Sequence, residues 1–183
     1  MKPIGPLMHE HRLIERMLSV IKAEVLRIKG GETAEPYLIG QTIDFFRTYA
    51  DRCHHGKEED ILFRELKNRE ISDSHRTMME ELIREHVEGR SLVSDLDESY
   101  RQLLRTGDET ASQVVASNLN RLLSFYPRHI KKEDKDFFHP VMEYFSQDEM
   151  NDMLKEFENF EKELLHNKYA EMIQGWEGSS ESK

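Results

Sequence analysis

The sequence predicts an all-α protein, an up-down-up-down four-helix bundle with an additional helix at its C-terminal end. Apolar residues recur every three or four positions through most of the 183 residues, and glycine, proline and capping residues fall between the periodic runs. No segment of the sequence alternates apolar and polar residues as a half-buried strand would. Long helices joined by short connections are typical of an antiparallel bundle.

The first two helices are separated by a glycine pair. Helical periodicity begins at about residue 7 and stops at Gly30-Gly31. The second periodic run opens at residues 33–36, where an early proline is tolerated in a first helical turn, and continues to about residue 68. We therefore expect a short loop and two neighbouring antiparallel helices.

The third and fourth helices also have local start signals. The third is expected over residues 72–105. The run "TGDE" then offers a capping box from Thr106 to Glu109 for the fourth helix. Pro127 is expected to kink or split that helix, because proline lacks an amide proton and clashes with the preceding turn.

The chain is expected to form one domain with a C-terminal extension. Residues 1–145 make the bundle, and a second capping box, from Ser146 to Glu149, starts a further helix over residues 146–175. Residues 176–183 are expected to be a flexible tail. The sequence offers no function for this extension.

Composition excludes several classes of partner. The net charge is −10, which argues against nucleic acid or an anionic membrane, because both select clustered lysine and arginine. The N-terminal residues contain no long apolar run, so no signal peptide or transmembrane helix is expected. Cys53 is the single cysteine, which excludes an internal disulfide and any CxxC motif. We expect a cytoplasmic protein of undetermined oligomeric state.

Each of the four bundle helices places a histidine in its apolar stripe, and two of these histidines are followed one turn later by glutamate. The inward histidines and glutamates are His11, His54, Glu58, His86, His129 and Glu133. In an antiparallel bundle their positions along the helices form one layer, at a rise of about 1.5 Å per residue. Two inward carboxylates cost several kcal/mol unless a cation or strong partners compensate them, so the layer predicts a metal site.

The tandem histidines of "HHGKEE" leave two registers open, His54 with Glu58 or His55 with Glu59. The stripe through His54 is apolar, whereas the face of His55 contains arginine and is wetter, so His54 is the expected ligand. His55 remains an alternative or additional ligand. The remaining histidines are expected at the surface or at helix ends: His9, His75, His139 and His166.

The donor set indicates the kind of metal. Four imidazoles and two carboxylates exceed what one tetrahedral zinc uses. They suit two octahedral first-row ions bridged by the carboxylates and a solvent oxygen, with iron or manganese favoured by the mixture of nitrogen and oxygen ligands and zinc as a possible substitute.

Four segments, taken together, resemble the hemerythrin-like, HHE cation-binding family. They are "EHRLIERML", "HHGKEEDILF", "EHVEGRSLV" and "RHIKKEDKDFF", and the resemblance covers about residues 7–145. It implies a four-helix bundle around a non-haem di-iron centre held by histidines and bridging carboxylates, which map onto the six residues of the predicted layer.

The sequence departs from the invertebrate oxygen carrier of that family in the third helix. The oxygen carrier has two histidines one turn apart there, whereas Leu82 and Arg90 flank His86 at that spacing. The centre therefore lacks one imidazole, unless His55, another carboxylate or water replaces it. This departure speaks against reversible oxygen carriage.

Three functions follow as hypotheses. The first is binding of, or reaction with, a small diatomic ligand, oxygen or nitric oxide, in sensing, storage or protection. The second is an iron-handling or redox enzyme, which repairs iron–sulfur centres or reduces peroxide or nitric oxide. Because Cys53 provides no dithiol, such an enzyme needs a reductase partner. In the third, the bundle is structural and its histidines only titrate.

Overall fold

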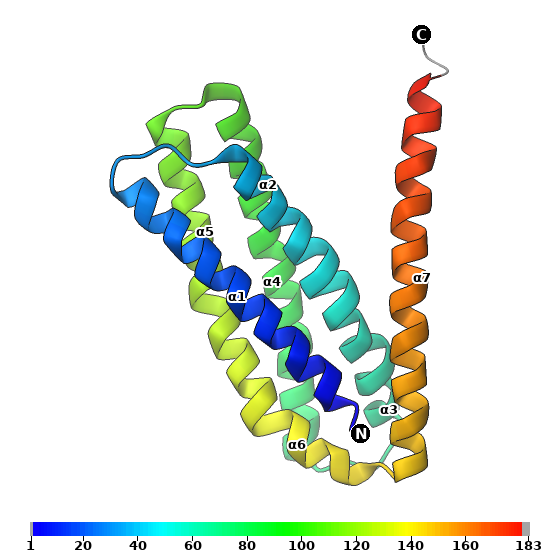
Figure 1. The fold of residues 1–183 in the computed structure, drawn as a ribbon. Coiled ribbons are helices and arrows are strands. Elements are labelled where there is room, and N and C mark those ends of the chain that lie inside the picture. The colour runs from blue at the N-terminus through cyan, green and yellow to red at the C-terminus, as the bar shows by residue number, and fades with distance from the viewer. Residues whose placement is uncertain (1, 181–183) are drawn as a thin grey trace.

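A computed structural model describes the backbone of residues 2–180 and the side chains of residues 2–164. Within that part the chain is helical, without strands, and its long helices run antiparallel (Figure 1). The bundle contains α1 (Ile4–Lys29), α2 (Pro36–Phe45), η1 (Phe46–His55), η2 (Glu58–Leu62), α3 (Phe63–Lys67), α4 (Asp73–Thr106), α5 (Glu109–Lys132), η3 (Glu133–Phe137), α6 (Phe138–Val141) and η4 (Met142–Tyr144). The last helix is α7 (Gln147–Ser180).

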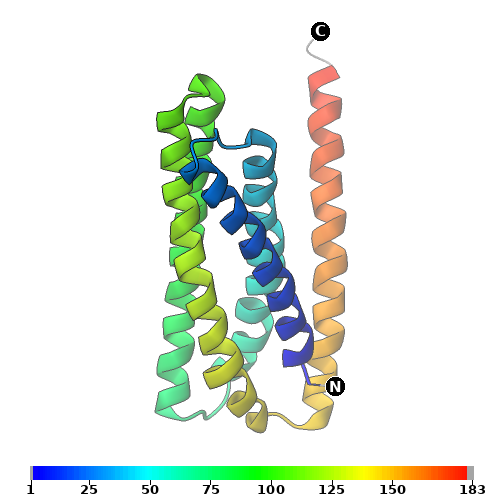
Figure 2. The same cartoon turned by 60° about the vertical axis from the view of Figure 1, so that its left-hand side comes forward.

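The helices form four arms and one flanking helix. The second arm is the nearly continuous run from α2 to α3, and the fourth is the run from α5 to η4. α1 packs on α5, α5 on α4, and α4 on α2 and η1. α7 contacts η1 and η2 from outside the bundle, as Figure 2 also shows. The predicted bundle with an additional C-terminal helix is confirmed. No helix of the described residues is long and apolar enough to cross a membrane.

The predicted starts of α4 and α7 are confirmed, whereas the capping residue predicted for α5 is wrong. The hydroxyl of Ser72 accepts from the amide of His75 at the start of α4, and Ser146 and Glu149 exchange both capping-box bonds at the start of α7. α5, however, is capped by Asp108, whose carboxylate accepts from the amide of Ala111 at 2.7 Å. Thr106 cannot cap α5, since it still belongs to α4.

Pro127 does not split α5. The helix continues from Glu109 to Lys132 through the proline. Phe125, Tyr126 and Ile130 flank the proline and are buried in the core. We attribute the continuity to this packing, since buried side chains on both sides offset the one hydrogen bond that proline cannot donate.

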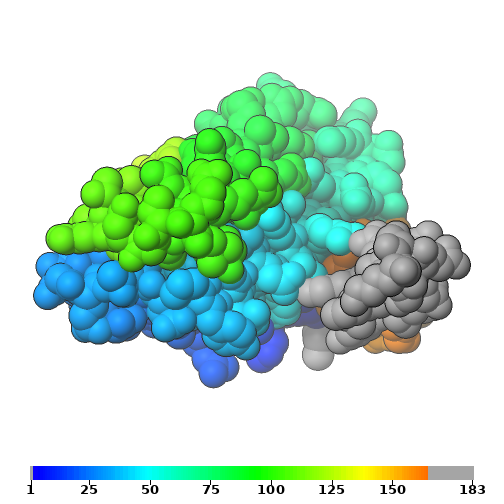
Figure 3. Space-filling view, turned by 90° about the horizontal axis from the view of Figure 1, so that it is seen from above, coloured from blue at the N-terminus to red at the C-terminus, as the bar shows by residue number. Residues whose placement is uncertain are grey.

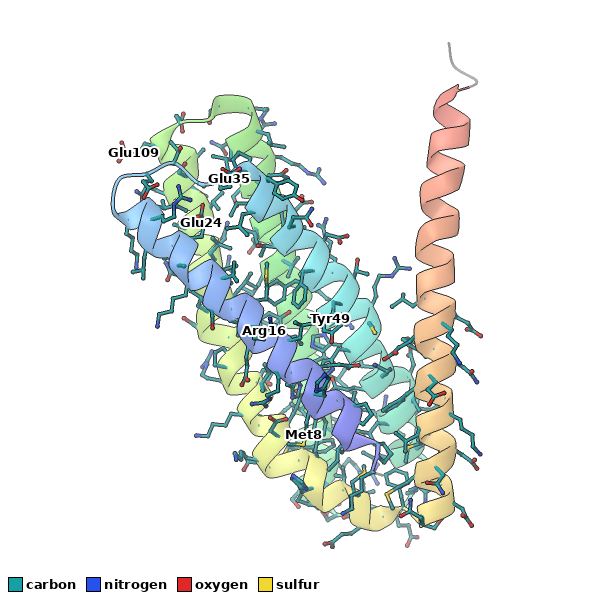
Figure 4. The ribbon with its side chains drawn as sticks, in the orientation of Figure 1. Met8, Arg16, Glu24, Glu35, Tyr49 and Glu109 are labelled. Atoms are coloured by element: carbon teal, nitrogen blue, oxygen red, sulfur yellow. The ribbon has the colours of Figure 1, made fainter. Side chains whose placement is uncertain are left out.

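The end of the bundle opposite the N-terminus is closed by polar contacts. The loop after α1 lies beside the turn between α4 and α5, as seen from that end in Figure 3. The amide of Ala34 donates to Ser112 Oγ at 3.0 Å, and the amide of Glu35 donates to the buried carboxylate of Glu24 at 2.7 Å (Figure 4). Gly107 ends α4 with φ of 62°, a left-handed conformation that glycine adopts at least cost.

The apolar core consists of two clusters. One contains Ile14, Ala50 and Ile130, and the other contains Leu7 and Phe137 among its members. Along each arm, the buried histidines, and with them Glu58 and Glu133, fall between residues of the two clusters. A polar layer therefore crosses the bundle between two apolar regions.

Three π-helical segments occur at this layer. η1 ends with His54 and His55, η2 begins with Glu58, and η3 begins with Glu133. The i→i+5 bonds of a π-helix widen the turn and reduce the angle between successive side chains, and such turns are frequent at functional sites. This widening explains how two consecutive histidines face the same interior.

Candidate metal centre

Seven buried side chains from all four arms meet in the polar layer. Their exposed fractions are at most 2%. They are His11 on α1, His54 and His55 on η1, Glu58 on η2, His86 on α4, His129 on α5 and Glu133 on η3. The six residues predicted from the sequence are brought together, and His55 joins them.

The seven side chains form two groups that could each hold a metal ion. His55, His86 and His129 make one, and His11 and His54 with the two glutamates make the other, with the potential ligand atoms of each group within 4.8 Å of one another. Five nitrogen donors and two carboxylates are thus available.

Both glutamates also reach from one group to the other. Glu58 places one oxygen 3.4 Å from Nε2 of His54 and its other oxygen 3.4 Å from Nε2 of His86. Glu133 lies 3.1 Å from Nε2 of His11 through one oxygen and 3.3 Å from Nε2 of His129 through the other. Each carboxylate is therefore placed as a bridge.

All five imidazoles are oriented by carboxylates outside the layer. In each, Nδ1 lies beside a carboxylate oxygen, which leaves Nε2 directed inward. The pairs are His11 with Asp134 (2.7 Å), His54 with Glu10 (2.9 Å), His55 with Asp51 (3.4 Å), His86 with Glu59 (2.7 Å) and His129 with Glu85 (2.8 Å). A carboxylate that accepts from the outer nitrogen fixes the tautomer and ring orientation of a metal-binding histidine.

Arginine and lysine side chains form ion pairs with these outer carboxylates. Arg90 contacts both Asp51, at 2.7 Å, and Glu59, at 2.6 Å. The other pairs are Arg12 with Asp134, Lys57 with Glu10, and Lys132 with Glu85. These ion pairs hold the outer carboxylates in place.

Phenylalanine rings support three of the imidazoles. Phe138 stacks on His11 at 5.7 Å between ring centroids, and Phe125 stacks on His129 at 5.5 Å. Phe63 stacks on His86 from the side of the second cluster, at 6.0 Å. These contacts restrict ring rotation and limit access of water to the layer.

The inward atoms of the layer are left without hydrogen-bond partners. Seven buried side-chain atoms in the described residues lack a partner, and six of them belong to the layer. The six are Nε2 of His11, His54 and His129, both oxygens of Glu58, and Oε2 of Glu133. Unpaired buried polar atoms are rare and costly, so their convergence on one space indicates an occupant that bonds to lone pairs. A cation can bond to these six atoms. The described residues provide no hydrogen-bond partner for them.

Burial and charge shift the pKa values of the layer in different directions. Burial lowers the pKa of His55 to about 3 and that of His54 well below its usual value, so both imidazoles are neutral near pH 7. Burial opposes charge on His11 as well, but its carboxylate partners outweigh that effect and raise its pKa to about 9. Burial raises the pKa of Glu58, and the charge of Glu133 adds to the shift. A metal entering this layer would displace protons.

The wet face expected for His55 is wrong, because its side chain is 1% exposed. The π-helical turn of η1 directs it inward, where its ring stacks on that of His86 at 3.9 Å. His55 thus lies beside His86 of α4. Its imidazole occupies the region in which α4 itself offers no second histidine. His9 and His139 are exposed and His75 is partly exposed, as expected, and the His166 side chain lies outside the described residues.

The outer carboxylates were not predicted from the sequence. Glu10, Glu59, Glu85 and Asp134 are each adjacent in sequence to a residue of the layer, but all four contact a histidine on another arm. The sequence indicates these carboxylates only through adjacent pairs such as "EH" and "EE", in which an acidic residue is next to a residue of the layer. Such a pair does not indicate which helix the carboxylate faces.

A third acidic group lies outside the layer and is already neutralised. Its potential ligand atoms are close enough together to hold an ion, and they belong to Glu10, Cys53 and Glu161. Nζ of Lys57, however, contacts both glutamates. The lysine supplies the positive charge there, so this group is not a metal candidate.

Comparison with known proteins agrees with this geometry. Residues 2–141 match the model of the hemerythrin HHE cation-binding domain, which covers the bundle but not α7. No curated protein and no solved structure matches significantly. The match extends over most of the chain, and the buried histidines and glutamates of the layer are compatible with metal binding. The chain therefore belongs to the hemerythrin HHE cation-binding domain family.

Proposed function

We propose that the chain binds two iron ions in the polar layer and that the metal centre binds, or reacts with, a small diatomic ligand such as oxygen or nitric oxide. Sensing, storage and protection are the corresponding roles. The observation that carries the proposal is the set of six unpartnered donor atoms converging on one buried space.

The ligand set divides naturally between two ions. His11 and His54 would hold one ion, and His55, His86 and His129 the other. Glu58 and Glu133 would bridge them, since each already lies near imidazoles of both groups.

The donor chemistry favours iron. Imidazole suits iron, zinc, copper and nickel, whereas carboxylate favours harder ions, so the combination suits iron, with manganese or zinc as substitutes. Bound iron would supply redox chemistry and an open coordination position for the diatomic ligand. The group with His11 and His54 offers one imidazole fewer, so an ion held there would keep more open positions.

The surrounding residues prepare the layer for that chemistry. The five outer carboxylates hold a proton on Nδ1 and leave Nε2 free. Phe63, Phe125 and Phe138 exclude water from the inner side of the rings. Because the chain contains one cysteine and no dithiol, repeated redox turnover would require a separate reductase.

Elemental analysis of protein purified without an affinity metal tests the proposal. We expect about two iron atoms per chain, the number for which the donors suffice. His54→Ala and His55→Ala should each lose bound metal, whereas His139→Ala, which removes an exposed histidine outside the layer, should retain it.

Two outcomes would contradict the proposal, and a third would reduce the set of ligands. No metal after anaerobic reconstitution with ferrous iron would remove the ligand assignment. Full metal content in His55→Ala would remove His55 from the ligands but leave the other six. Iron-loaded protein whose absorption does not respond to nitric oxide or azide would refute the diatomic ligand.

A further inference from the structure

A cavity connects the surface of the bundle with the metal layer. Its volume is about 270 Å³, and it lies between η1, α4 and α5. Arg47 and Arg90 line its exposed end, and His55, Phe46 and Tyr126 line its buried end. Three larger described cavities, of about 510, 420 and 300 Å³, are lined by none of the seven layer residues. This cavity therefore gives a route to the layer that those cavities do not.

The buried end of the cavity contains an unpartnered hydroxyl. The side chain of Tyr126 is 1% exposed, and its hydroxyl makes no hydrogen bond to another residue of the part of the chain that the structure describes. Burial raises the pKa of this phenol above its usual range, so near pH 7 it is a hydrogen-bond donor.

Gly89 keeps the space in front of this hydroxyl open. It lines the same cavity, one turn beyond His86 on α4. A Cβ at position 89 would lie 3.6 Å from the Tyr126 oxygen and 3.3 Å from a ring carbon of Phe125. Any larger side chain at position 89 would therefore extend into the cavity or displace these rings.

The charges at the exposed end are paired. Arg47 contacts Asp97 at 2.9 Å, and Arg90 contacts both Asp51 and Glu59. Neither guanidinium is free to concentrate anions. Phe46 and Val93 make the walls further in apolar, so the cavity suits a small uncharged molecule that can accept one hydrogen bond.

We propose that this cavity is the entrance for the exogenous ligand of the metal centre and that Tyr126 donates a hydrogen bond to that ligand beside His55. The ligand is small, uncharged and a hydrogen-bond acceptor. Tyr126 thus determines specificity, Gly89 maintains the opening, and the inference rests on the proposed function of the layer.

Xenon tests the cavity without reference to metal. Crystals of the protein as purified, pressurised with xenon, should contain a xenon atom between Phe46 and Tyr126. Gly89→Leu should lose that atom. Gly40→Leu is the matched control, because Gly40 is also a helical glycine facing a tyrosine hydroxyl, that of Tyr100, and does not line this cavity. Absence of xenon from the wild-type cavity would overturn the route.

Nitric oxide tests the route kinetically in the iron-loaded ferrous protein. In stopped-flow absorption, Gly89→Leu should slow association by about tenfold or more relative to Gly40→Leu, because entry then requires local opening of the helices. Wild-type association should not depend on ionic strength. Equal rates in the two leucine variants would overturn the entrance, and a steep salt dependence would overturn the uncharged ligand.

Tyr126→Phe tests the hydrogen bond alone, since it leaves the ring in place. Affinity should fall by about threefold to tenfold, the size of one neutral hydrogen bond, and the loss should be in the dissociation rate. Tyr100→Phe is the control and should leave affinity unchanged. Unchanged affinity in Tyr126→Phe would refute the donor role.

Failure of the proposed metal binding and failure of the proposed entrance give different results. If wild-type protein takes up no iron, the proposed function fails, while the xenon experiment still decides whether the cavity is open. If Gly89→Leu does not fold, as judged by circular dichroism, Gly89→Ala replaces it and should slow association in the same direction by a smaller factor. Unchanged association in Gly89→Ala would then refute the role of Gly89.

Discussion

Replacement of Lys57 by methionine should destabilise the protein by about 3 kcal/mol, because it leaves a buried carboxylate without its cation. The Lys57 side chain is 0% exposed, and its ammonium contacts Glu10 and Glu161. Glu10 also accepts from Nδ1 of His54 at 2.9 Å, so the lysine connects α7 to the metal layer.

The size of the effect follows from the exposure of the two partners. Removing one member of a buried ion pair costs about 3–5 kcal/mol. The side chain of Glu161 is 46% exposed and can turn to water, whereas that of Glu10 is 9% exposed and cannot. We therefore expect the lower end of the range, which corresponds to a decrease in Tm of about 6–12 °C for a chain of this length.

Urea unfolding measures this change, with metal content determined first because bound metal adds to stability. Lys155→Met is the control, since Lys155 makes only a surface pair with Asp152 and should change stability by less than about 0.5 kcal/mol. Adding Glu10→Gln to Lys57→Met should recover part of the loss. A loss below about 1 kcal/mol in Lys57→Met, or no recovery in the double variant, would refute the reasoning.

Three further predictions concern the outer carboxylates, the core and the attachment of α7. Glu59→Ala should lower metal affinity by about 10–100-fold, because this carboxylate orients the imidazole of His86 on α4. Asp60→Ala, at the exposed neighbouring position, should leave the affinity unchanged. Equal affinities of the two variants in competition with a chelator would contradict this prediction. Leu96→Ala should cost about 2–5 kcal/mol in urea unfolding without changing metal content, because Leu96 is fully buried and lies ten residues beyond His86 along α4. Lost metal would contradict this separation. The hydrogen bond from Arg69 lowers the pKa of Glu149 to about 2. The pair therefore contributes stability above the usual glutamate pKa, and this stability is lost as the pH falls toward 2. Arg69→Ala should return the pKa of Glu149 toward its usual value in a carboxyl NMR titration, and an unchanged pKa would refute the pairing.

Much of the candidate site is readable from local patterns. His11, His86 and His129 interrupt apolar stripes of period three to four, and their burial follows from that periodicity alone. The spacing of His129 and Glu133 likewise places both on one face of a helix. The capping box of Ser146 and Glu149 acts within a few residues of sequence and was predicted for the same reason.

Other features depend on contacts between arms. Asp108 rather than Thr106 caps α5 because α4 continues to Thr106, and packing around Pro127 keeps α5 continuous. The partner of each outer carboxylate is equally non-local, as with Glu85, which comes before His86 in sequence but contacts His129. Periodicity gives the face of a helix, and it does not say which neighbour that face meets.

The sequence by itself determined the helical bundle and six inward histidines and glutamates, because helical periodicity and capping are local properties of the chain. The tertiary structure decided that His55 also faces the layer, since the π-helical geometry of η1 turns two consecutive imidazoles inward. It also decided that Lys57 joins α7 to the layer through Glu10 and Glu161. Both depend on how distant segments pack, and that information is not contained in the spacing of residues along one helix.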